Sequence, residues 1–245
     1  MHLLEGKNVT KSFGGLTAVS AVDFFVDEGE IIGLIGPNGA GKTTLFNLIS
    51  AALEPKPGEI RFKGKRINGL NPYQICRLGI ARTFQTVKIF SNLPVIENVR
   101  IGSLFGPQKR LSAAEATKVA MEQLEFVGLS EAAHTPARDL TLAAQKRLEV
   151  ARALATKPSL LLLDEIMAGL NQTELNLAME LVKKIQGRGI TIIMIEHVMK
   201  AIMNICSRII VLHHGQKIAE GTPQEVANSK TVIEVYLGVQ SNAGS

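Results

Sequence analysis

The sequence predicts an α/β fold built on a mostly parallel β-sheet, with antiparallel strands at its beginning and helices inserted near its middle. Apolar runs of strand length lie at residues 31–35, 160–163 and 190–195. Helical segments separate these runs, and strands that alternate with helices are typical of a parallel sheet with helices on both faces. With 245 residues and 46% apolar composition, the chain can bury a full core.

Antiparallel strands are expected first. Residues 8–13 and 17–26 are rich in apolar and β-branched side chains, and the Gly-Gly pair between them is typical of a turn. The run Ile31–Ile35 then indicates a buried strand. Glycines follow it, and a helix is predicted from residue 41 to about residue 53, ending before Pro55.

Helices and strands continue to alternate after this strand, loop and helix. A helix-rich insertion is predicted over about 86–155, and it contains a helix over 112–126. Another helix, over 173–186, separates the two later buried strands. The shorter predicted strands are 59–62 and 80–84, and 209–212 with 216–219 as a closing hairpin.

Composition argues against a nucleic-acid-binding or membrane-spanning protein. The net charge is +5, but the Lys and Arg residues are scattered, and aromatic residues make up only 4% with no Trp, so a basic patch and stacking aromatics are not indicated. No apolar run approaches the roughly 20 residues that cross a bilayer, and residues 1–11 lack the pattern of a secretory signal, which predicts a cytosolic location. Cys76 and Cys206 lie far apart without metal-like spacing, which favours two reduced thiols.

A glycine-rich motif follows the first buried strand. Residues 36–43 fit the pattern G-x-x-x-x-G-K-[ST], and they lie between a strand and a helix, as a phosphate-binding loop requires. Glycines let successive backbone N–H groups face phosphates, and the helix directs its positive dipole end at them. Lys42 is expected to reach the β- and γ-phosphates, and Thr43 to bind Mg²⁺. The candidate nucleotide-binding residues here are Gly36, Pro37, Asn38, Gly39, Ala40, Gly41, Lys42, Thr43 and Thr44.

Two acidic residues end the second buried strand. Asp164 and Glu165 follow four leucines, at the C-terminal strand edge where ligands bind in an open α/β sheet. Asp164 fits an acid that holds Mg²⁺, and Glu165 fits a general base or a residue that orients water for attack on the γ-phosphate. His197 is expected at the same edge as a hydrogen-bond donor to the γ-phosphate. The sequence thus predicts binding and hydrolysis of Mg-ATP.

Taken together and in this order along the chain, these motifs make residues from about 4 to 238 resemble the nucleotide-binding domain of ABC transporters. The resemblance implies a P-loop NTPase fold with an N-terminal antiparallel β subdomain and an inserted helical subdomain. It also implies a single domain with these parts: core 1–85 and 156–240, helical subdomain about 86–155, and tail 241–245.

The resemblance assigns roles to further residues. Phe13 matches the aromatic residue that stacks on adenine. Gln85, in the sequence Arg-Thr-Phe-Gln, matches the glutamine that approaches Mg²⁺ and the attacking water. Residues 140–144, called the signature segment below, match the family signature, in which Thr141 and Ala143 would contact the nucleotide of a second subunit. Thr141 can also cap the helix that follows.

Among ABC proteins, the chain most resembles the branched-chain amino acid uptake ATPases. The segments that carry this resemblance are 82–85, 90–99, 148–154, 195–197 and 220–238. The resemblance implies two ATPases, identical or paralogous, that pair beneath membrane permease subunits. It also implies a solute-binding protein that delivers the solute to the permease. The resemblance implies a place on the inner face of the cell membrane and no nucleic-acid partner.

Three other interpretations stay open. An ABC ATPase of another system, such as lipopolysaccharide export, fits because the permease selects the cargo. A soluble ABC ATPase that acts on DNA or ribosomes would normally add a coiled coil, a second cassette or a basic tail. A P-loop small-molecule kinase would leave Asp164, Glu165 and His197 without a role.

Several residues depart from the family pattern. Ala143 stands where the signature has its second Gly, so its Cβ is expected to weaken contact with the partner's nucleotide. Ile166 replaces the Pro that usually follows the catalytic Glu, and Val198 replaces an Asp common after the switch His. Asn171 stands where Asp is commoner. These changes concern the rate of turnover more than the binding of ATP.

Overall fold

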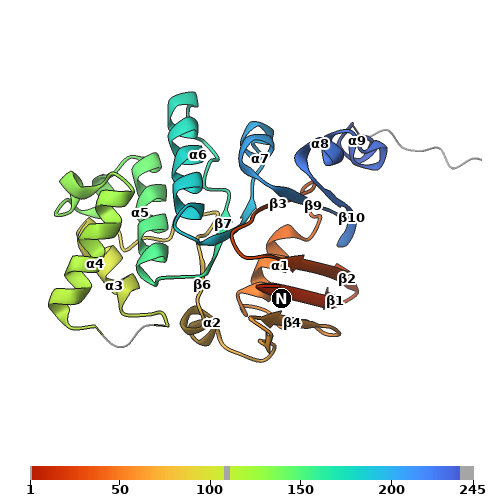
Figure 1. Cartoon of the computed structure of the whole chain (residues 1–245), viewed down its shortest axis with the longest axis horizontal. Helices are drawn as coiled ribbons and strands as arrows, with labels where there is room; N and C mark the ends of the chain where they lie inside the picture. Colours follow the sequence, from red (N-terminus) through yellow and green to blue (C-terminus); the bar gives the residue numbers. More distant parts are fainter. Residues whose placement is uncertain (1, 108–110, 238–245) are drawn as a thin grey trace, which may run out of the picture. The chain divides into compact units, whose positions relative to one another are not determined.

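The computed structural model describes residues 2–107 and 111–237. Contacts divide these residues into two compact units (Figure 1). The first unit comprises residues 2–70 and 193–237, and the second unit comprises the described part of residues 71–192. Both units contain strands and helices, so the predicted α/β class is confirmed.

An antiparallel sheet begins the first unit, in the strand order β2-β1-β4-β5. β1 (Leu4–Phe13) pairs with β2 (Leu16–Val26), and a tight turn with Gly14 at φ +57° joins them. β4 (Glu59–Phe62) pairs with the other edge of β1, and β5 (Lys65–Arg66) lies beside β4. The predicted antiparallel strands at the N-terminus are confirmed.

β1 begins earlier than the predicted residue 8. Its pairing with β2 shifts register between Gly6 and Val9, and Asn8 adopts a left-handed conformation with φ +49°. An irregularity of this kind interrupts the alternation of buried and exposed side chains by which a strand is recognised in a sequence.

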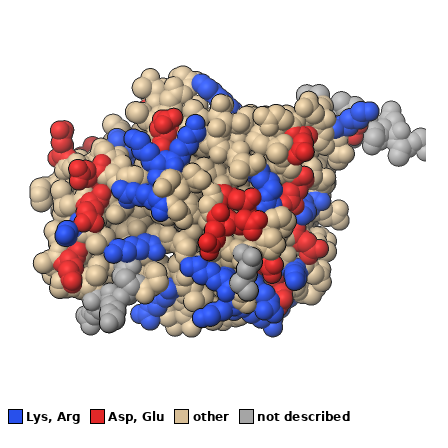
Figure 2. Space-filling view, in the orientation of Figure 1, with Lys and Arg blue, Asp and Glu red and all other residues tan. Residues whose placement is uncertain are grey.

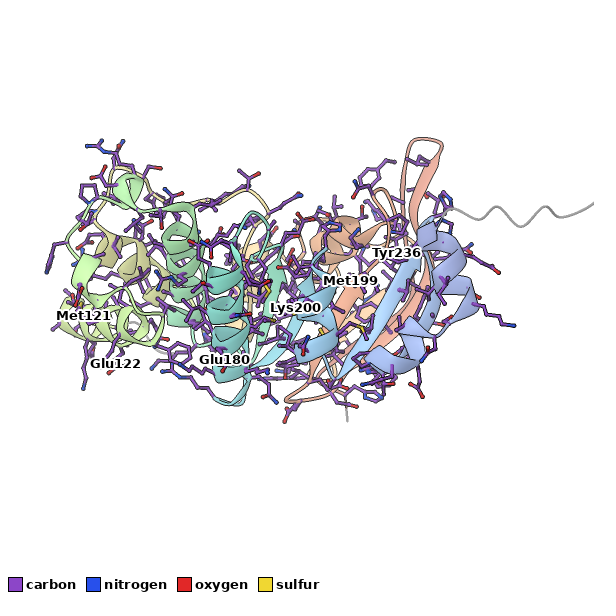
Figure 3. All side chains as sticks on the ribbon, turned by 90° about the horizontal axis from the view of Figure 1, so that it is seen from above. Met121, Glu122, Glu180, Met199, Lys200 and Tyr236 are labelled. Atoms are coloured by element: carbon purple, nitrogen blue, oxygen red, sulfur yellow. The ribbon has the colours of Figure 1, made fainter. Side chains whose placement is uncertain are left out.

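Parallel strands form the other part of the first unit. β3 (Ile31–Ile35) is buried along its whole length and runs parallel to β9 (Arg208–His213). β10 (Gln216–Gly221) pairs antiparallel with β9, which confirms the predicted hairpin. Helix α1 (Lys42–Ile49) follows β3, and α7 (Met199–Ile205) begins with two exposed side chains, Met199 and Lys200 (Figure 3).

Close packing joins α7 to β3. A Cβ on Gly33 would lie 3.1 Å from the sulfur of Cys206 and 3.2 Å from the side chain of Ile202, so the absence of a side chain at Gly33 makes room for the helix. Burial, together with the nearby Glu196 carboxylate, raises the pKa of the Cys206 thiol to about 12. Cys206 and Cys76 are both free thiols, as predicted.

The helices of the first unit differ from the predicted ones at two places. α1 ends at Ile49 rather than near residue 53, because Ala51 adopts a left-handed conformation with φ +54° that no helix can continue. The sequence analysis also missed the short helices α8 (Pro223–Ala227) and α9 (Lys230–Leu237). α8 has a clear start signal, since the Thr222 hydroxyl accepts a hydrogen bond from the backbone N–H of Glu225 at 3.3 Å.

Two parallel strands lie at the centre of the second unit. β6 (Ile80–Arg82) pairs with β7 (Leu160–Asp164), with Ile80 opposite Leu160. β6 is shorter than the predicted strand over 80–84 and ends at Arg82. The Thr83 hydroxyl after it accepts a hydrogen bond from the Asp164 N–H at 3.1 Å. β8 (Thr191–Ile195) begins in the second unit and ends in the first.

Helices make up most of the second unit. α3 (Val95–Ser103), α4 (Ala113–Phe126) and α5 (Leu142–Ala155) pack against one another, as expected for a helix-rich insertion. α4 buries Leu124 toward its neighbours, whereas Glu122 projects to solvent (Figure 3). The other two helices are α2 (Pro72–Leu78) and α6 (Gln172–Gln186).

None of the helices in the described residues is long and apolar enough to cross a lipid bilayer. Contacts group residues 86–155 with β6 and β7 in the second unit, and the division into a core and a separate helical subdomain at 86–155 stays a prediction.

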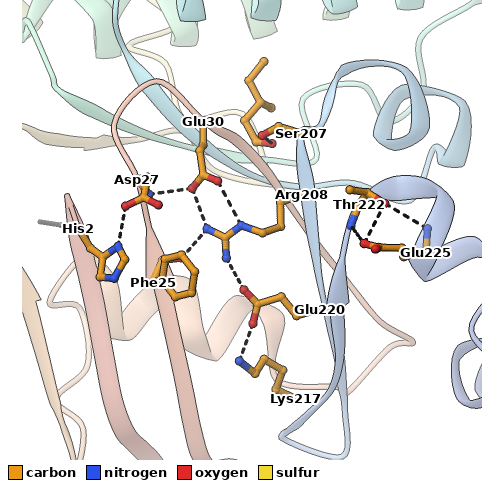
Figure 4. Close-up of polar contacts among 11 residues, drawn as sticks. His2, Phe25, Asp27, Glu30, Ser207, Arg208, Lys217, Glu220, Thr222 and Glu225 are labelled. Atoms are coloured by element: carbon orange, nitrogen blue, oxygen red, sulfur yellow. Dashed lines mark hydrogen bonds and ion pairs between the residues drawn. The ribbon is translucent and has the colours of Figure 1, made fainter.

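A cluster of charges around Arg208 joins several segments of the first unit (Figure 4). The Arg208 guanidinium donates to Glu30 at 2.7 Å and to Glu220, and it donates to the backbone carbonyl of Phe25 at 2.9 Å. It also lies 4.2 Å from the centre of the Phe25 ring. The Arg208 side chain is only 15% exposed, so these contacts are partly shielded from water.

Replacement of Arg208 by Met should lower the free energy of unfolding by about 2–4 kcal/mol, because two partly buried carboxylates would lose their cation. Arg138→Met is the matched control, since Arg138 is 63% exposed beside Asp139 and exposed ion pairs contribute less than about 1 kcal/mol. Urea unfolding of both variants measures the difference. Equal losses in the two variants would contradict the importance assigned to the Arg208 cluster.

Candidate functional site

Two glycines fit the phosphate loop, residues 36–43, to its surroundings. Gly36 has φ +151° and Gly41 has φ +100°. A Cβ on Gly36 would lie 2.1 Å from the carbonyl oxygen of Leu212, and a Cβ on Gly41 would lie 2.4 Å from that of Ala18. Only glycine meets both the conformation and the packing at these positions. The loop therefore leaves its backbone bare, as a cradle for phosphates requires.

Lys42 lies in the loop with its side chain directed inward. Its ammonium donates hydrogen bonds to the carbonyls of Gly36 at 2.6 Å and Pro37 at 3.0 Å, and the residue is 7% exposed. The positive charge thus lies next to the N-terminus of α1, where the helix dipole also attracts anions. Thr43, on the first turn of α1, is exposed, so its hydroxyl can reach a ligand.

Phe13 and His197 occupy accessible positions in the same unit. Phe13 ends β1 and is 47% exposed, so it is not a core residue, and the Lys11 ammonium lies 5.7 Å from its ring centre. His197 follows the end of β8 and is exposed, whereas its neighbour Glu196 is buried. Both positions suit a residue that contacts a ligand.

Tyr236 is a neighbour of the phosphate loop that the sequence analysis missed. It lies on α9 (Figure 3), and its hydroxyl makes a hydrogen bond with the backbone of Gly36. Burial raises the pKa of this hydroxyl, and the bond to Gly36 acts in the opposite direction. No local motif marks such a contact, because the two residues lie at opposite ends of the chain.

The second unit brings two charged side chains together at the ends of its parallel strands. β7 delivers Asp164, which is 2% exposed, and β6 delivers Arg82, whose Nη2 lies 2.9 Å from Asp164 Oδ2. Parallel pairing explains this, since neighbouring parallel strands end at the same edge of a sheet. The sequence analysis gave Arg82 no role of its own.

Gln85 and Glu165, both predicted site residues, lie side by side. Gln85 Nε2 donates to Glu165 Oε2 at 2.9 Å. Glu165 adopts a left-handed backbone conformation with φ +51°, which is unfavourable for a residue with a Cβ. The chain thus holds the Glu165 carboxylate in one place by a strained turn and by a hydrogen bond.

The loop after Gln85 is fixed by α5. The backbone N–H of Lys88 donates to Glu149 Oε1 at 3.2 Å, and Arg152 donates to the carbonyl of Lys88. Glu149 is 2% exposed, and burial raises its pKa, while the Lys88 N–H acts in the opposite direction. In the sequence, Glu149 is a charged residue between the apolar Leu148 and Val150. A charge within an apolar stretch is a signal that could have indicated this contact.

The signature segment, residues 140–144, begins α5. Thr141 is its N-cap, and the Thr141 hydroxyl accepts a hydrogen bond from the Ala144 N–H at 3.3 Å, as predicted. Ala143 is half-buried in the first turn of the helix. The first-turn N–H groups of a helix attract anions, which suits this segment to contact a phosphate.

Each unit offers oxygen ligands of the kind that suit a magnesium ion bound together with a nucleotide. Among the described residues, no group of three or more His, Cys, Asp or Glu side chains is arranged to hold a metal ion. Thr43 in the first unit offers a hydroxyl, and Asp164 in the second unit offers a carboxylate. Oxygen ligands are those that Mg²⁺ prefers. Phosphate oxygens and water usually complete such a site.

Two family models match the chain. Residues 19–168 match the ABC transporter model, and residues 216–241 match the model of the branched-chain amino acid ATP-binding cassette transporter. The first match includes the phosphate loop, Gln85, the signature segment and Asp164.

Curated relatives match over nearly their whole length. The chain is 39% identical over 249 residues to the high-affinity branched-chain amino acid transport ATP-binding protein BraF of Pseudomonas aeruginosa, covering 96% of this chain and 98% of the relative. It is 40% identical over 249 residues to the corresponding protein LivG of Escherichia coli, with the same coverage of 96% and 98%.

Solved structures share the fold. An ATP-binding cassette of an ABC transporter in its ADP conformation superposes with a TM-score of 0.88 at 32% identity, covering 97% of this chain and 99% of that chain. A dimeric cassette bound to ADP and phosphate gives a TM-score of 0.80 at 30% identity, covering 90% of this chain and 98% of that chain. The chain therefore belongs to the ABC transporter family, as an ATP-hydrolysing, transport-coupled subunit of the branched-chain amino acid group.

Proposed function

We propose that this subunit hydrolyses Mg-ATP to drive the import of branched-chain amino acids. One observation carries the choice of solute: the chain covers 98% of the length of two proteins named for branched-chain amino acid transport, at 39% and 40% identity. Leucine, isoleucine and valine are the cargo that this similarity supports. The permease, rather than this subunit, would select among them.

The first unit would bind the nucleotide. The bare backbone of the phosphate loop and the inward ammonium of Lys42 support binding of the triphosphate. Thr43 would hold Mg²⁺ and Phe13 would stack on adenine, and the exposure of both side chains supports these roles. The proposed binding residues also include Gly36, Pro37, Asn38, Gly39, Ala40, Gly41 and Thr44.

The second unit would supply the groups that act on water. Glu165 would orient and deprotonate the attacking water, and Gln85 would help hold it in line, which their 2.9 Å hydrogen bond supports. Asp164 and Gln85 would contact Mg²⁺, which neutralises charge on the phosphates when it is bound. Arg82 would hold the Asp164 carboxylate in place for that purpose. His197, from the first unit, would donate a hydrogen bond to the γ-phosphate.

The partners we propose follow from the expectation that Lys42 and the loop N–H groups cover only one side of a bound triphosphate. Thr141 and Ala143 of the signature segment would close the nucleotide held by a second ATP-binding subunit, identical or paralogous. The pair would attach to membrane permease subunits at the inner face of the cell membrane. A solute-binding protein would deliver the amino acid to the permease.

Nucleic acid is not among the proposed partners. Figure 2 shows Asp and Glu side chains among the Lys and Arg side chains on the face that it presents. Nucleic-acid-binding proteins instead gather their basic residues into a patch or stripe. This mixture of charges supports the proposal.

Two substitutions should separate ATP binding from hydrolysis. Glu165→Gln should lower turnover by about 100-fold or more with ATP affinity kept within a few-fold, because a general base contributes about 10² to 10⁴ in rate. Lys42→Ala should weaken both ATP binding and hydrolysis, since Lys42 would contact the phosphates. Turnover and nucleotide affinity of the two variants provide the test. Wild-type turnover in Glu165→Gln would remove Glu165 from the proposed role.

In a complex reconstituted with the permease subunits and the solute-binding protein, leucine, isoleucine or valine should stimulate ATP hydrolysis severalfold more than sugars or metal ions. The measurement is the ATPase rate at saturating solute, with Glu165→Gln as the background control. Stimulation by a lipid or a sugar alone would refute the proposed cargo.

Replacement of Ala143 by Gly should strengthen ATP-dependent pairing by about tenfold, equivalent to 1.4 kcal/mol, because the Cβ would no longer separate the helix from the partner's γ-phosphate. Sedimentation of Glu165→Gln, with and without the second change, measures pairing in Mg-ATP. Ala114→Gly is the matched control, because Ala114 is exposed and holds the same position in α4 as Ala143 does in α5. Unchanged or weaker pairing in the Ala143 variant would show that the Cβ is not an obstacle.

A further inference from the structure

We infer that Lys146 is a positioning residue for Glu165, through which the signature helix α5 controls the hydrolytic carboxylate. This inference rests on the role proposed above for Glu165. In this role, Lys146 does not contact the reacting atoms. It acts on the backbone that carries the Glu165 side chain.

The contact is direct and buried. The Lys146 ammonium donates a hydrogen bond to the carbonyl oxygen of Glu165 at 3.0 Å and another to that of Ala168 at 2.5 Å. Lys146 is only 8% exposed. Hydrogen bonds from a charged donor are about twice as strong as those between neutral groups, so this ammonium holds both carbonyls firmly.

The turn that Lys146 holds needs support from outside. Glu165 has φ +51°, and a left-handed conformation costs a residue with a Cβ about 1–2 kcal/mol. Ile166 follows it, so no proline ring restricts the next backbone angle. Within the turn, the Ala168 N–H donates to the Glu165 carbonyl at a long 3.3 Å. The same carbonyl accepts the shorter bond from Lys146.

Lys146 connects this turn to the signature segment. It lies at the start of the second turn of α5, and the Gln145 side chain before it donates to the Leu140 carbonyl at 3.1 Å. The start of α5 and the Lys146 side chain therefore move as one piece. A displacement of that helix would shift the Glu165 carbonyl and with it the carboxylate that Gln85 contacts.

Hydrolysis would therefore depend on the position of α5. If α5 is correctly placed, for instance by a nucleotide that the signature segment contacts, Glu165 is held in its strained conformation. If α5 moves, the ammonium withdraws and the turn can relax. Misplacement of a reacting group by about 1 Å costs on the order of 100-fold in rate.

Arg147 provides a matched control on the same helix. Its guanidinium also donates to two backbone carbonyls, those of Val127 at 3.1 Å and Gly128 at 3.2 Å. Those carbonyls belong to the turn after α4, not to the turn that carries Glu165. Loss of Arg147 therefore also removes charged hydrogen bonds to two backbone carbonyls, without touching the proposed catalytic residue.

The test compares Lys146→Met, Lys146→Arg and Arg147→Met in the full chain assembled with its permease subunits. Lys146→Met should lower kcat by about 10- to 100-fold with the affinity for Mg-ATP kept within about 3-fold. Lys146→Arg should restore most of the rate, since arginine can also donate to two carbonyls. Arg147→Met should keep kcat within about 2-fold of the wild type. A Lys146→Met rate within twofold of wild type, or equal losses in the Lys146→Met and Arg147→Met variants, would overturn the inference.

Combination with Glu165→Gln separates this inference from the role of Glu165 itself. If Lys146 acts through Glu165, Lys146→Met should lower the residual rate of Glu165→Gln by less than about 2-fold, because residues that act as a unit are not additive. Losses that multiply would refute the action through Glu165. If Glu165→Gln alone retains full turnover, the proposed role of Glu165 fails first, whatever Lys146→Met does.

Discussion

At Gly36 and Gly41 the phosphate loop approaches the carbonyl oxygens of Leu212 and Ala18 more closely than any residue with a Cβ would allow. Ala18 belongs to β2 and Leu212 to β9, so both sheets of the first unit are built against this loop. The turn between β9 and β10 adds a hydrogen bond from the Gly215 N–H to the loop carbonyl of Ala40 at 3.1 Å. A loop confined in this way keeps its N–H groups in one arrangement, and a preorganised site loses little entropy when an anion binds.

In the second unit, contacts of buried charged side chains fix the geometry, as close packing fixes the phosphate loop in the first unit. Asp164 is 2% exposed, Lys146 8% and Glu149 2%, and each contacts an oppositely charged group or a backbone atom of a segment distant in sequence. Buried ionic contacts add little net stability, because removal of the charges from water is costly. Such contacts do, however, form only when the side chains adopt one arrangement, and a hydrolytic site needs its groups held that precisely. Steric exclusion thus shapes the phosphate loop of the first unit, whereas electrostatics shapes the proposed hydrolytic site of the second unit.

The sequence predicted those features that depend on neighbouring residues. The motif at residues 36–43 and the apolar runs that became β3 and β7 needed only local patterns. Short helices such as α8 were missed because they are shorter than a helical period can show, although the Thr222 and Glu225 capping box was present in the sequence. The contact from Lys146 to Glu165 could not be predicted, since it depends on how α5 packs against the turn after β7.

The sulfur of Cys206 lies under β3, against Gly33, with a thiol pKa of about 12. Thiol reagents attack the thiolate, and at pH 7 only on the order of one molecule in 10⁵ would carry it at that pKa. Modification of Cys206 therefore requires α7 to separate from β3 and admit water. Since α7 begins shortly after His197 and the chain contains no Trp for fluorescence, the labelling rate of this buried thiol reports the local opening of the protein next to the histidine that we propose as a contact of the γ-phosphate.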